Sequence, residues 1–262
     1  MEKKQNFSGN FSVKTNYGTL AAAAIPLVVI AGAYAAFTFL NRWRGNKKNR
    51  VLKRSVSLSV LHGGKQALER LLDYQKARSD FSDTLGTAEC HLKTLLEDSP
   101  HLDFKLLQRN VAKMEMSGNE DKAIEILEKA LKRAKKDEKT LDDYEIEMLI
   151  VEALIYKGEF DKAQNRKCLD DRRISADARR ALYKAIILMA KGEKLQARKN
   201  WEEFVEIRRH FDDFPPSVKE SMEEILESNG LDKIMTKFDE FEKFVNRFQQ
   251  DIDKAKRKKT KN

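Results

Sequence analysis

The sequence predicts an all-α protein, a short right-handed helical-repeat solenoid preceded by one transmembrane helix. Past residue 60, apolar residues recur at spacings of three and four, which is the helical period. The 262 residues include only four Pro and eleven Gly, too few for the many turns of a β-sandwich. Residues 20–40 contain no charged residue, as expected of a membrane span.

The pattern divides the chain into seven segments. In order, they are a short N-terminal segment (1–19), a transmembrane anchor (20–40), a basic linker (41–61), N-terminal helices (62–102), helical repeats (103–214), capping helices (215–252) and a basic disordered tail (253–262).

The predicted anchor has the length and the flanks of a single membrane span. At about 1.5 Å per residue, a helix over residues 20–40 is roughly 31 Å long, which matches the hydrocarbon core of a bilayer. Trp43 follows at the position of an interfacial aromatic residue. The alternative is a cleaved signal peptide, since Ala33-Tyr34-Ala35 offers small residues at a suitable spacing. Because the apolar run continues to Leu40 and basic residues follow at once, we favour the span.

Basic residues on the two sides of this segment predict its orientation. Three lysines precede it, and seven basic residues follow: Arg42, Arg44, Lys47, Lys48, Arg50, Lys53 and Arg54. The positive-inside rule therefore predicts a single-pass membrane protein whose bulk faces the cytosol. A moderately hydrophobic span with basic residues after it resembles the signal anchors of mitochondrial and plastid outer membranes, and the endoplasmic reticulum is the alternative location.

The net charge of +9 is concentrated at the two flanks of the body. Residues 42–54 and 254–261 are rich in Lys and Arg and contain no acid, so the body between them is mildly acidic. This distribution does not favour a nucleic-acid-binding face spread over a domain. The flanks themselves leave open a minor hypothesis, binding of anionic lipid or RNA.

A motif of glycine and alanine recurs three times in the body. Gly118, Gly158 and Gly192 are each followed five residues later by an alanine, namely Ala123, Ala163 and Ala197. The glycines are 40 and 34 residues apart. We expect each glycine to end one helix in the left-handed conformation. We expect each alanine to let the next helix approach its partner closely.

These units resemble the tetratricopeptide repeat family, whose unit is two antiparallel helices recurring at about 34 residues. The resemblance covers roughly residues 103–211. The second unit departs from the pattern, because Lys167 and Asp170 stand where apolar or small residues belong. The residues that we expect to pack the repeats are Gly118, Ala123, Leu127, Ala130, Gly158, Ala163, Gly192, Ala197 and Trp201. An ordinary helical bundle whose turns end in glycine is the alternative.

The resemblance implies a scaffold or adaptor that binds proteins along the concave side of the repeats. Some family members bind acidic C-termini through a clamp of Lys, Asn and Arg, but the matching Lys and Asn positions of the first unit here are Gln108 and Ala112. The alternative function is a structural or assembly subunit of an organelle membrane complex. In the caps, the stripe that includes Phe238, Phe241 and Phe248 is typical of core packing.

No pattern of catalytic or ligand-binding residues is present. The four histidines and two cysteines have no zinc-binding spacing, and no glycine-rich phosphate loop occurs. We therefore expect no enzymatic activity, no cofactor, no metal and no small-molecule substrate. Cys90 and Cys168 are expected to be small packing residues.

Overall fold

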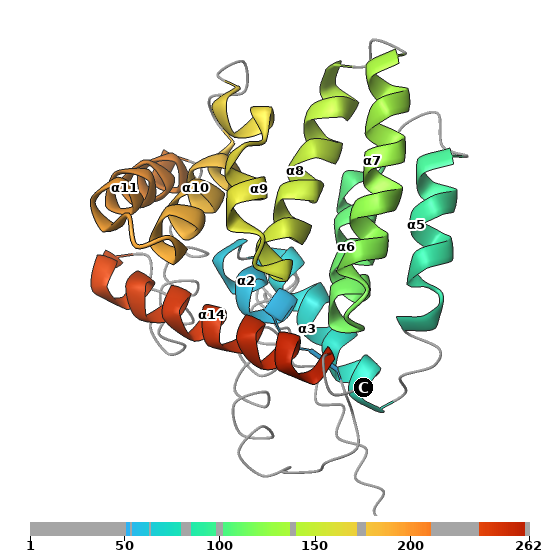
Figure 1. The fold of residues 1–262 in the computed structure, drawn as a ribbon, viewed down its shortest axis with the longest axis horizontal. Coiled ribbons are helices and arrows are strands. Elements are labelled where there is room, and N and C mark those ends of the chain that lie inside the picture. Colours follow the sequence, from blue (N-terminus) through green and yellow to red (C-terminus); the bar gives the residue numbers. More distant parts are fainter. Residues whose placement is uncertain are drawn as a thin grey trace, which may run out of the picture.

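The computed structural model describes residues 51–52, 54–62, 64–79, 85–97, 102–136, 140–171, 177–210 and 236–259. These residues form helices and turns without any strand, which agrees with the all-α prediction (Figure 1). The α-helices are α2 (Arg54–His62), α3 (Gly64–Ser79), α5 (Ala88–Glu97), α6 (Phe104–Met116), α7 (Glu120–Lys136), α8 (Thr140–Lys157), α9 (Phe160–Gln164), α10 (Ala178–Ala190), α11 (Lys194–His210) and α14 (Phe238–Lys259), and the 3₁₀ helix is η1 (Lys167–Asp170).

The predicted fold class needs one correction. Within the ranges given above, no helix is both long enough and apolar enough to cross a bilayer. The longest, α14, is strongly charged, and α8 carries acids along its length. The predicted anchor, residues 20–40, lies outside the described residues. The structure therefore supports the all-α body, and the part of the chain that it describes contains no membrane-spanning helix.

Side-chain caps fix the start of two of the repeat helices. Asp103 precedes α6 and accepts a hydrogen bond from the backbone N–H of Leu106 at 3.0 Å. Asp177 precedes α10 and accepts one from the N–H of Arg179 at 2.9 Å. Each carboxylate satisfies an N–H group that has no partner within the helix, so these aspartates define where the helices begin.

The three turn glycines share one backbone geometry. Their φ angles are 76° at Gly118, 73° at Gly158 and 83° at Gly192. In each turn the glycine N–H donates to the carbonyl three residues back, and the following N–H donates to the carbonyl five residues back. The alanine five residues after each glycine is fully buried at the start of the next helix: Ala123, Ala163 and Ala197. The same helix–turn–helix unit therefore occurs three times.

These units stack side by side (Figure 1). Helices α6, α8 and α10 are successive neighbours, and α5 packs on both α6 and α7. An ion pair at equivalent positions joins each unit to the next. Its lysine directly precedes a turn glycine, and its aspartate follows the turn glycine of the previous unit by three residues. Lys157 Nζ lies 2.7 Å from Asp121 Oδ1, and Lys191 Nζ lies 2.8 Å from Asp161 Oδ1. The stack is thus helical-repeat-like in its contacts as well as in its backbone.

The second unit departs from the others in its second helix. Helix α9 ends at Gln164, and the 3₁₀ helix η1 follows it. Lys167 and Asp170 are exposed, whereas Cys168 and Leu169 between them are buried. The polar residues at both ends of this short segment prevent one face from being apolar over several turns, so a regular α-helix does not continue.

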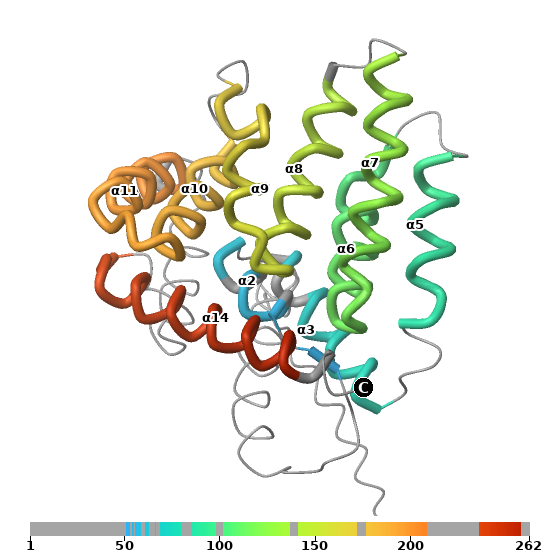
Figure 2. Tube along the Cα trace, viewed as in Figure 1, coloured from blue at the N-terminus to red at the C-terminus, as the bar shows by residue number. Residues whose placement is uncertain are grey.

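The α2–α3 pair lies against the repeats, near the middle of the view in Figure 2. Both helices pack on α6, and α2 also packs on α14. Helix α2 begins at Arg54, within the segment 41–61 that we predicted to be a linker. Its buried apolar residues explain the difference, since Val56, Leu58 and Leu61 face the interior.

Helix α14 crosses the ends of several repeat helices (Figure 1) and closes the core. Its apolar stripe is buried as the sequence pattern predicts, with Phe238, Phe241, Val245 and Phe248 all in the main hydrophobic cluster. The helix continues to Lys259, so much of the tail predicted to be disordered is helical. The stripe continues there too: Ile252 and Ala255 are buried.

Candidate functional site

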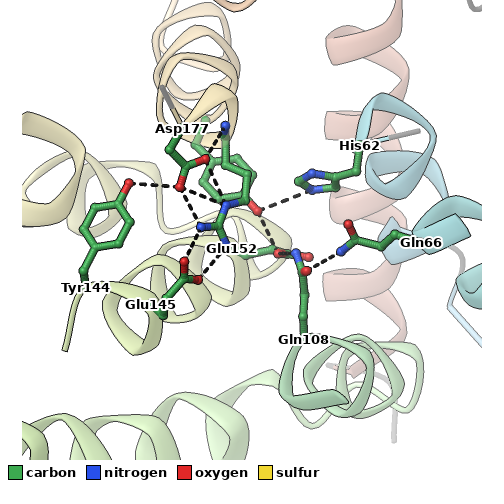
Figure 3. Close-up of polar contacts among 9 residues, drawn as sticks. His62, Gln66, Gln108, Tyr144, Glu145, Glu152 and Asp177 are labelled. Atoms are coloured by element: carbon green, nitrogen blue, oxygen red, sulfur yellow. Dashed lines mark hydrogen bonds and ion pairs between the residues drawn. The ribbon is translucent and has the colours of Figure 1, made fainter. Parts of the chain in front are cut away.

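A fully buried glutamate lies at the centre of the polar contacts between the α2–α3 pair and the repeats. Glu152, in the middle of α8, is 0% exposed. Its surroundings include Gln108 of α6 and Tyr183 of α10, both also buried. We call the side of α6, α8 and α10 that carries Gln108, Glu152 and Tyr183 the inner face. Figure 3 shows some of the polar contacts around this face, including that of Gln108 with Glu152.

Four donors surround the Glu152 carboxylate. Arg70 Nη2 of α3 lies 2.5 Å from Oε1, and the Tyr156 hydroxyl donates to the same oxygen at 2.7 Å. The Gln108 amide and the Tyr183 hydroxyl both donate to Oε2 at 2.7 Å. Three donors therefore come from the three repeat helices, and the only positive charge among the four donors comes from α3.

The charge of Glu152 is stabilised by these donors. Burial alone would raise the pKa of Glu152, but the Arg70 charge and the hydrogen bonds from Gln108 and Tyr156 hold the pKa at about 2. Burial likewise opposes the charge of Arg70, and Glu152 nevertheless raises the pKa of Arg70 above its ordinary value. Both groups are therefore ionised at neutral pH and form a buried ion pair.

His62, at the end of α2, borders the same cluster. Its Nε2 lies 3.4 Å from the Tyr183 hydroxyl, which already donates its hydrogen to Glu152. Burial and the charges of Arg70, Arg179 and Arg208 together lower the pKa of His62 to about 4, although the charge of Glu152 acts in the opposite direction. His62 is therefore neutral at physiological pH. Since the Tyr183 hydrogen points to Glu152, His62 Nε2 must be the donor of any hydrogen bond to Tyr183.

A second acidic site of the repeats receives Arg54 of α2. Arg54 Nε lies 2.7 Å from Glu115 Oε1, and its Nη2 lies 3.5 Å from Glu120 Oε2. Arg54 Nη1 donates to the carbonyl of Tyr156 at 2.6 Å. Arg54 is 1% exposed, so this basic residue, predicted to flank a membrane, is instead an internal ion-pair partner. The desolvated guanidinium fixes the start of α2 on α6, α7 and α8.

The reverse charge arrangement, an acid of α3 facing a base of α6, is found at Asp73. Asp73 of α3 accepts two hydrogen bonds from Arg109, at 2.5 Å from Nε and 2.8 Å from Nη2. Lys113 Nζ lies 3.8 Å from the same carboxylate. Gln66 donates to Gln108 and so extends the network to the Glu152 donors. The α2–α3 pair therefore presents Arg54, Arg70 and Asp73 to complementary charges on the repeats.

A separate ion-pair cluster joins α8 to α10 at the edge of the inner face (Figure 3). Arg179 Nη1 and Nη2 each lie 2.8 Å from a Glu145 oxygen, and Nη2 lies 2.6 Å from Asp177. The Tyr144 hydroxyl donates to Asp177 at 3.1 Å. Burial opposes the charge of Asp177, but Arg179 holds the pKa of Asp177 below its ordinary value. This cluster positions the two helices relative to each other.

One pocket opens where α3 passes the N-terminal half of α6. It has a volume of about 440 Å³ and is lined by Gln66, Glu69, Arg70, Asp103, Lys105, Leu106 and Arg109. We call it the α3–α6 pocket. Its lining combines charges of both signs with Leu106, which is 39% exposed. Arg70 connects the pocket directly to Glu152.

The structure places the predicted repeat-packing residues in turns and in the core. Gly118, Gly158 and Gly192 form the turns, and the remaining side chains of that set are buried: Ala123, Leu127, Ala130, Ala163, Ala197 and Trp201. The basic residues Arg42, Arg44, Lys47, Lys48, Arg50 and Lys53 lie outside the described residues. Gln108, at a clamp position of the family, donates to Glu152, and Ala112 is buried.

The residues of the inner face were not predicted to form a site. Glu152 interrupts an otherwise apolar stretch from Met148 to Ile155, and that interruption is the one feature of the sequence that could have indicated a buried charge. Its partner Arg70 is 82 residues away along the chain, and no short motif links them. The described residues contain no group of three His, Cys, Asp or Glu side chains arranged to hold a metal.

The cysteines differ in environment. Cys90 is exposed on α5, whereas Cys168 is buried in η1. Burial, assisted by the charge of Glu147, raises the pKa of the Cys168 thiol to about 12, so this thiol is unreactive at neutral pH.

Comparisons of the chain with protein-family models, with curated protein sequences and with solved structures gave no match.

Proposed function

We propose that this protein is a non-catalytic, tetratricopeptide-like scaffold that binds another protein at the α3–α6 pocket, which Arg70 connects to the inner face. The observation that carries the proposal is the composition of this pocket. It combines a half-exposed leucine with two arginines, a lysine and two acids, contributed by two separate helices. Such a combination suits an apolar side chain of a partner surrounded by polar contacts.

The repeat geometry supports this proposal. The three helix–turn–helix units place α6, α8 and α10 side by side, and helical solenoids of this kind provide extended binding surfaces. Two side chains that line the pocket are held in fixed orientations, Arg70 by Glu152 and Arg109 by Asp73. A surface that is ordered before binding loses little conformational entropy when a partner arrives.

The test is a photo-crosslinking amino acid placed at Leu106 in the full chain, with the same amino acid at Leu195 as a matched control. Leu195 is 79% exposed at the start of α11 and lies outside the pocket. We expect a discrete protein to be crosslinked from Leu106 alone and to copurify with the unmodified chain. We also expect Leu106→Glu to weaken that complex at least tenfold and Leu195→Glu to leave it unchanged.

Equal crosslinking from both positions would contradict the proposal. So would a complex that tolerates Leu106→Glu, provided that circular dichroism shows the variant to be folded.

A further inference from the structure

The polar contacts of the α2–α3 pair have the form of a ligand bound to a receptor. The receptor side is complete within the repeats, because Gln108, Tyr156 and Tyr183 orient the Glu152 carboxylate from α6, α8 and α10. The fourth donor, Arg70, belongs to α3 and is the only one of the four that carries a positive charge. A carboxylate held by three neutral donors is a preformed site for a guanidinium.

At the Arg54 site, too, the acidic groups come from the repeats and the arginine comes from the α2–α3 pair. Glu115, Glu120 and the Tyr156 carbonyl all belong to the repeat helices or to their ends, and the guanidinium of Arg54 belongs to α2. Both acidic sites therefore lie on the repeats and both arginines on the α2–α3 pair. Asp73, which faces Arg109 and Lys113, adds contacts of opposite sign between α3 and α6.

The apolar contacts of the pair are divided between two clusters. Leu58 and Leu61 of α2 join the main core. Val56, Leu71, Tyr74 and Ala77 instead form a small separate cluster, which also contains Leu85 and Met116. The described part of α3 thus contributes its buried apolar residues to the small cluster and its charges to the inner face. Of the described residues, release of the pair would therefore take only Leu58 and Leu61 from the main core, and the remaining core residues of α8, α10 and α14 could stay packed on one another.

We propose that the inner face is a receptor for an arginine-bearing helix, that the α2–α3 pair is its intramolecular ligand, and that a protein partner displaces the pair by presenting an arginine to Glu152. The partner is a helical segment with one arginine facing Glu152 and a second facing Glu115. This partner chemistry follows from the cost of leaving Glu152 without a cation in a buried position. The inference rests on the proposed function and adds the chemistry of the partner and the competition within the chain.

The first test is hydrogen–deuterium exchange of the full chain without a partner. We expect the amides of α2 and α3 to exchange at least tenfold faster than those of α8 and α10, because the pair opens without global unfolding. Exchange of all four helices at one common rate would overturn the inference. This measurement uses the natural chain and does not depend on a variant that folds.

The second test uses a labelled synthetic peptide of residues 51–79 as the probe. The receiving protein is the full chain with Arg54→Ala and Arg70→Ala, which weakens its own α2–α3 contacts. We expect it to bind the peptide at least tenfold more tightly than the unmodified chain does. Adding Glu152→Gln to the receiver, or Arg70→Ala to the peptide, should abolish this gain, whereas Lys76→Ala in the peptide, at an exposed position of α3, should not.

The two proposals fail in different ways. If the α2–α3 pair opens and the peptide binds, but no protein is crosslinked from Leu106, the proposed function is wrong and the receptor still stands. If a partner is crosslinked from Leu106 but the amides of α2 and α3 exchange as slowly as those of α8, the pair is a permanent part of the fold and this inference is wrong. The same conclusion follows if the folded receiver does not bind the peptide.

Discussion

A fully buried carboxylate destabilises a protein unless charged or polar groups surround it, and Glu152 has four donors at 2.5–2.7 Å. Two of these donors are tyrosine hydroxyls whose pKa values are raised well above normal, chiefly by burial, so they remain protonated as donors. At the residue scale, then, we expect the position of α3 on the repeats to depend on the charge of Glu152, which faces Arg70 of α3.

Replacing Glu152 with Gln tests this dependence. The variant keeps the shape of the side chain but leaves Arg70 buried without its counter-charge, and we expect the free energy of unfolding to fall by about 3 kcal/mol. Urea denaturation followed by circular dichroism measures the loss. The matched control is Glu125→Gln, which removes an exposed ion pair with Lys129 and should cause no measurable change. Similar losses in both variants would show that Glu152 is not buried in a paired state.

His62 predicts how stability depends on pH. Its pKa is about 4 in the folded protein and 6.5 as the ordinary value, so between these values the unfolded chain binds a proton that the folded chain does not. The free energy of unfolding should therefore decrease as the pH falls from 6.5 to 4, by up to about 3 kcal/mol. Glu152 contributes a separate loss at lower pH, between its ordinary value of 4.5 and about 2.

The control for this prediction is His62→Gln, which cannot titrate. Urea titrations at pH 7, 6, 5 and 4.5 should show a smaller decrease for this variant than for the unmodified protein. Parallel curves for the two proteins would mean that His62 keeps an ordinary pKa in the folded state.

At the scale of elements, the three turn glycines could be identified from the sequence because the need for a positive φ selects glycine strongly. The buried alanines followed from a fixed spacing of five residues. The stripe of α14 was equally visible because large apolar residues recur over several turns. By contrast, the start of α2 was missed, since Val56 and Leu58 are two residues apart among serines and do not show a helical period.

Two of the turn glycines are expected to differ in their tolerance of alanine. At Gly192 an added Cβ meets nothing within 4 Å, so Gly192→Ala should lose about 1 kcal/mol for the left-handed backbone alone. At Gly158 the Cβ would lie 2.9 Å from Ile252 Cγ2 and 2.8 Å from Lys256 Nζ. Because Ile252 is buried, Gly158→Ala should lose about 2–3 kcal/mol in urea denaturation. Equal losses would argue against the close approach of α14 to this turn.

Helix α14 is expected to be essential for stability. Phe241 is 0% exposed, and its ring centroid lies 6.3 Å from that of Trp201 on α11. Phe241→Ala should lower the free energy of unfolding by about 3–5 kcal/mol. Asn246→Ala, at an exposed position of the same helix, should change it by no more than about 0.5 kcal/mol. A small effect of Phe241→Ala would show that α14 does not close the core.

At the scale of the whole molecule, the helical class and the repeated units could be predicted, whereas the position of the α2–α3 pair could not. Local spacing indicates that a segment is helical and which face is apolar. The contacts of Arg54 with Glu115 and of Arg70 with Glu152 join residues 61 and 82 positions apart. No periodic pattern encodes such pairs, so the sequence alone predicted that Arg54 belongs to the basic segment beside the membrane anchor.

The packing of α3 against α6 is the contact on which the proposed pocket and the proposed receptor both depend. It is tested directly by replacing Gln66 and Gln108, whose side chains are hydrogen-bonded, with cysteine in a Cys90→Ser background. Cys168 is buried and unreactive, so mild oxidation can join only the introduced thiols. We predict that this pair forms an intramolecular disulfide and that Gln66→Cys and Leu195→Cys do not. A folded protein in which the first pair forms no disulfide would contradict the packing of α3 on α6.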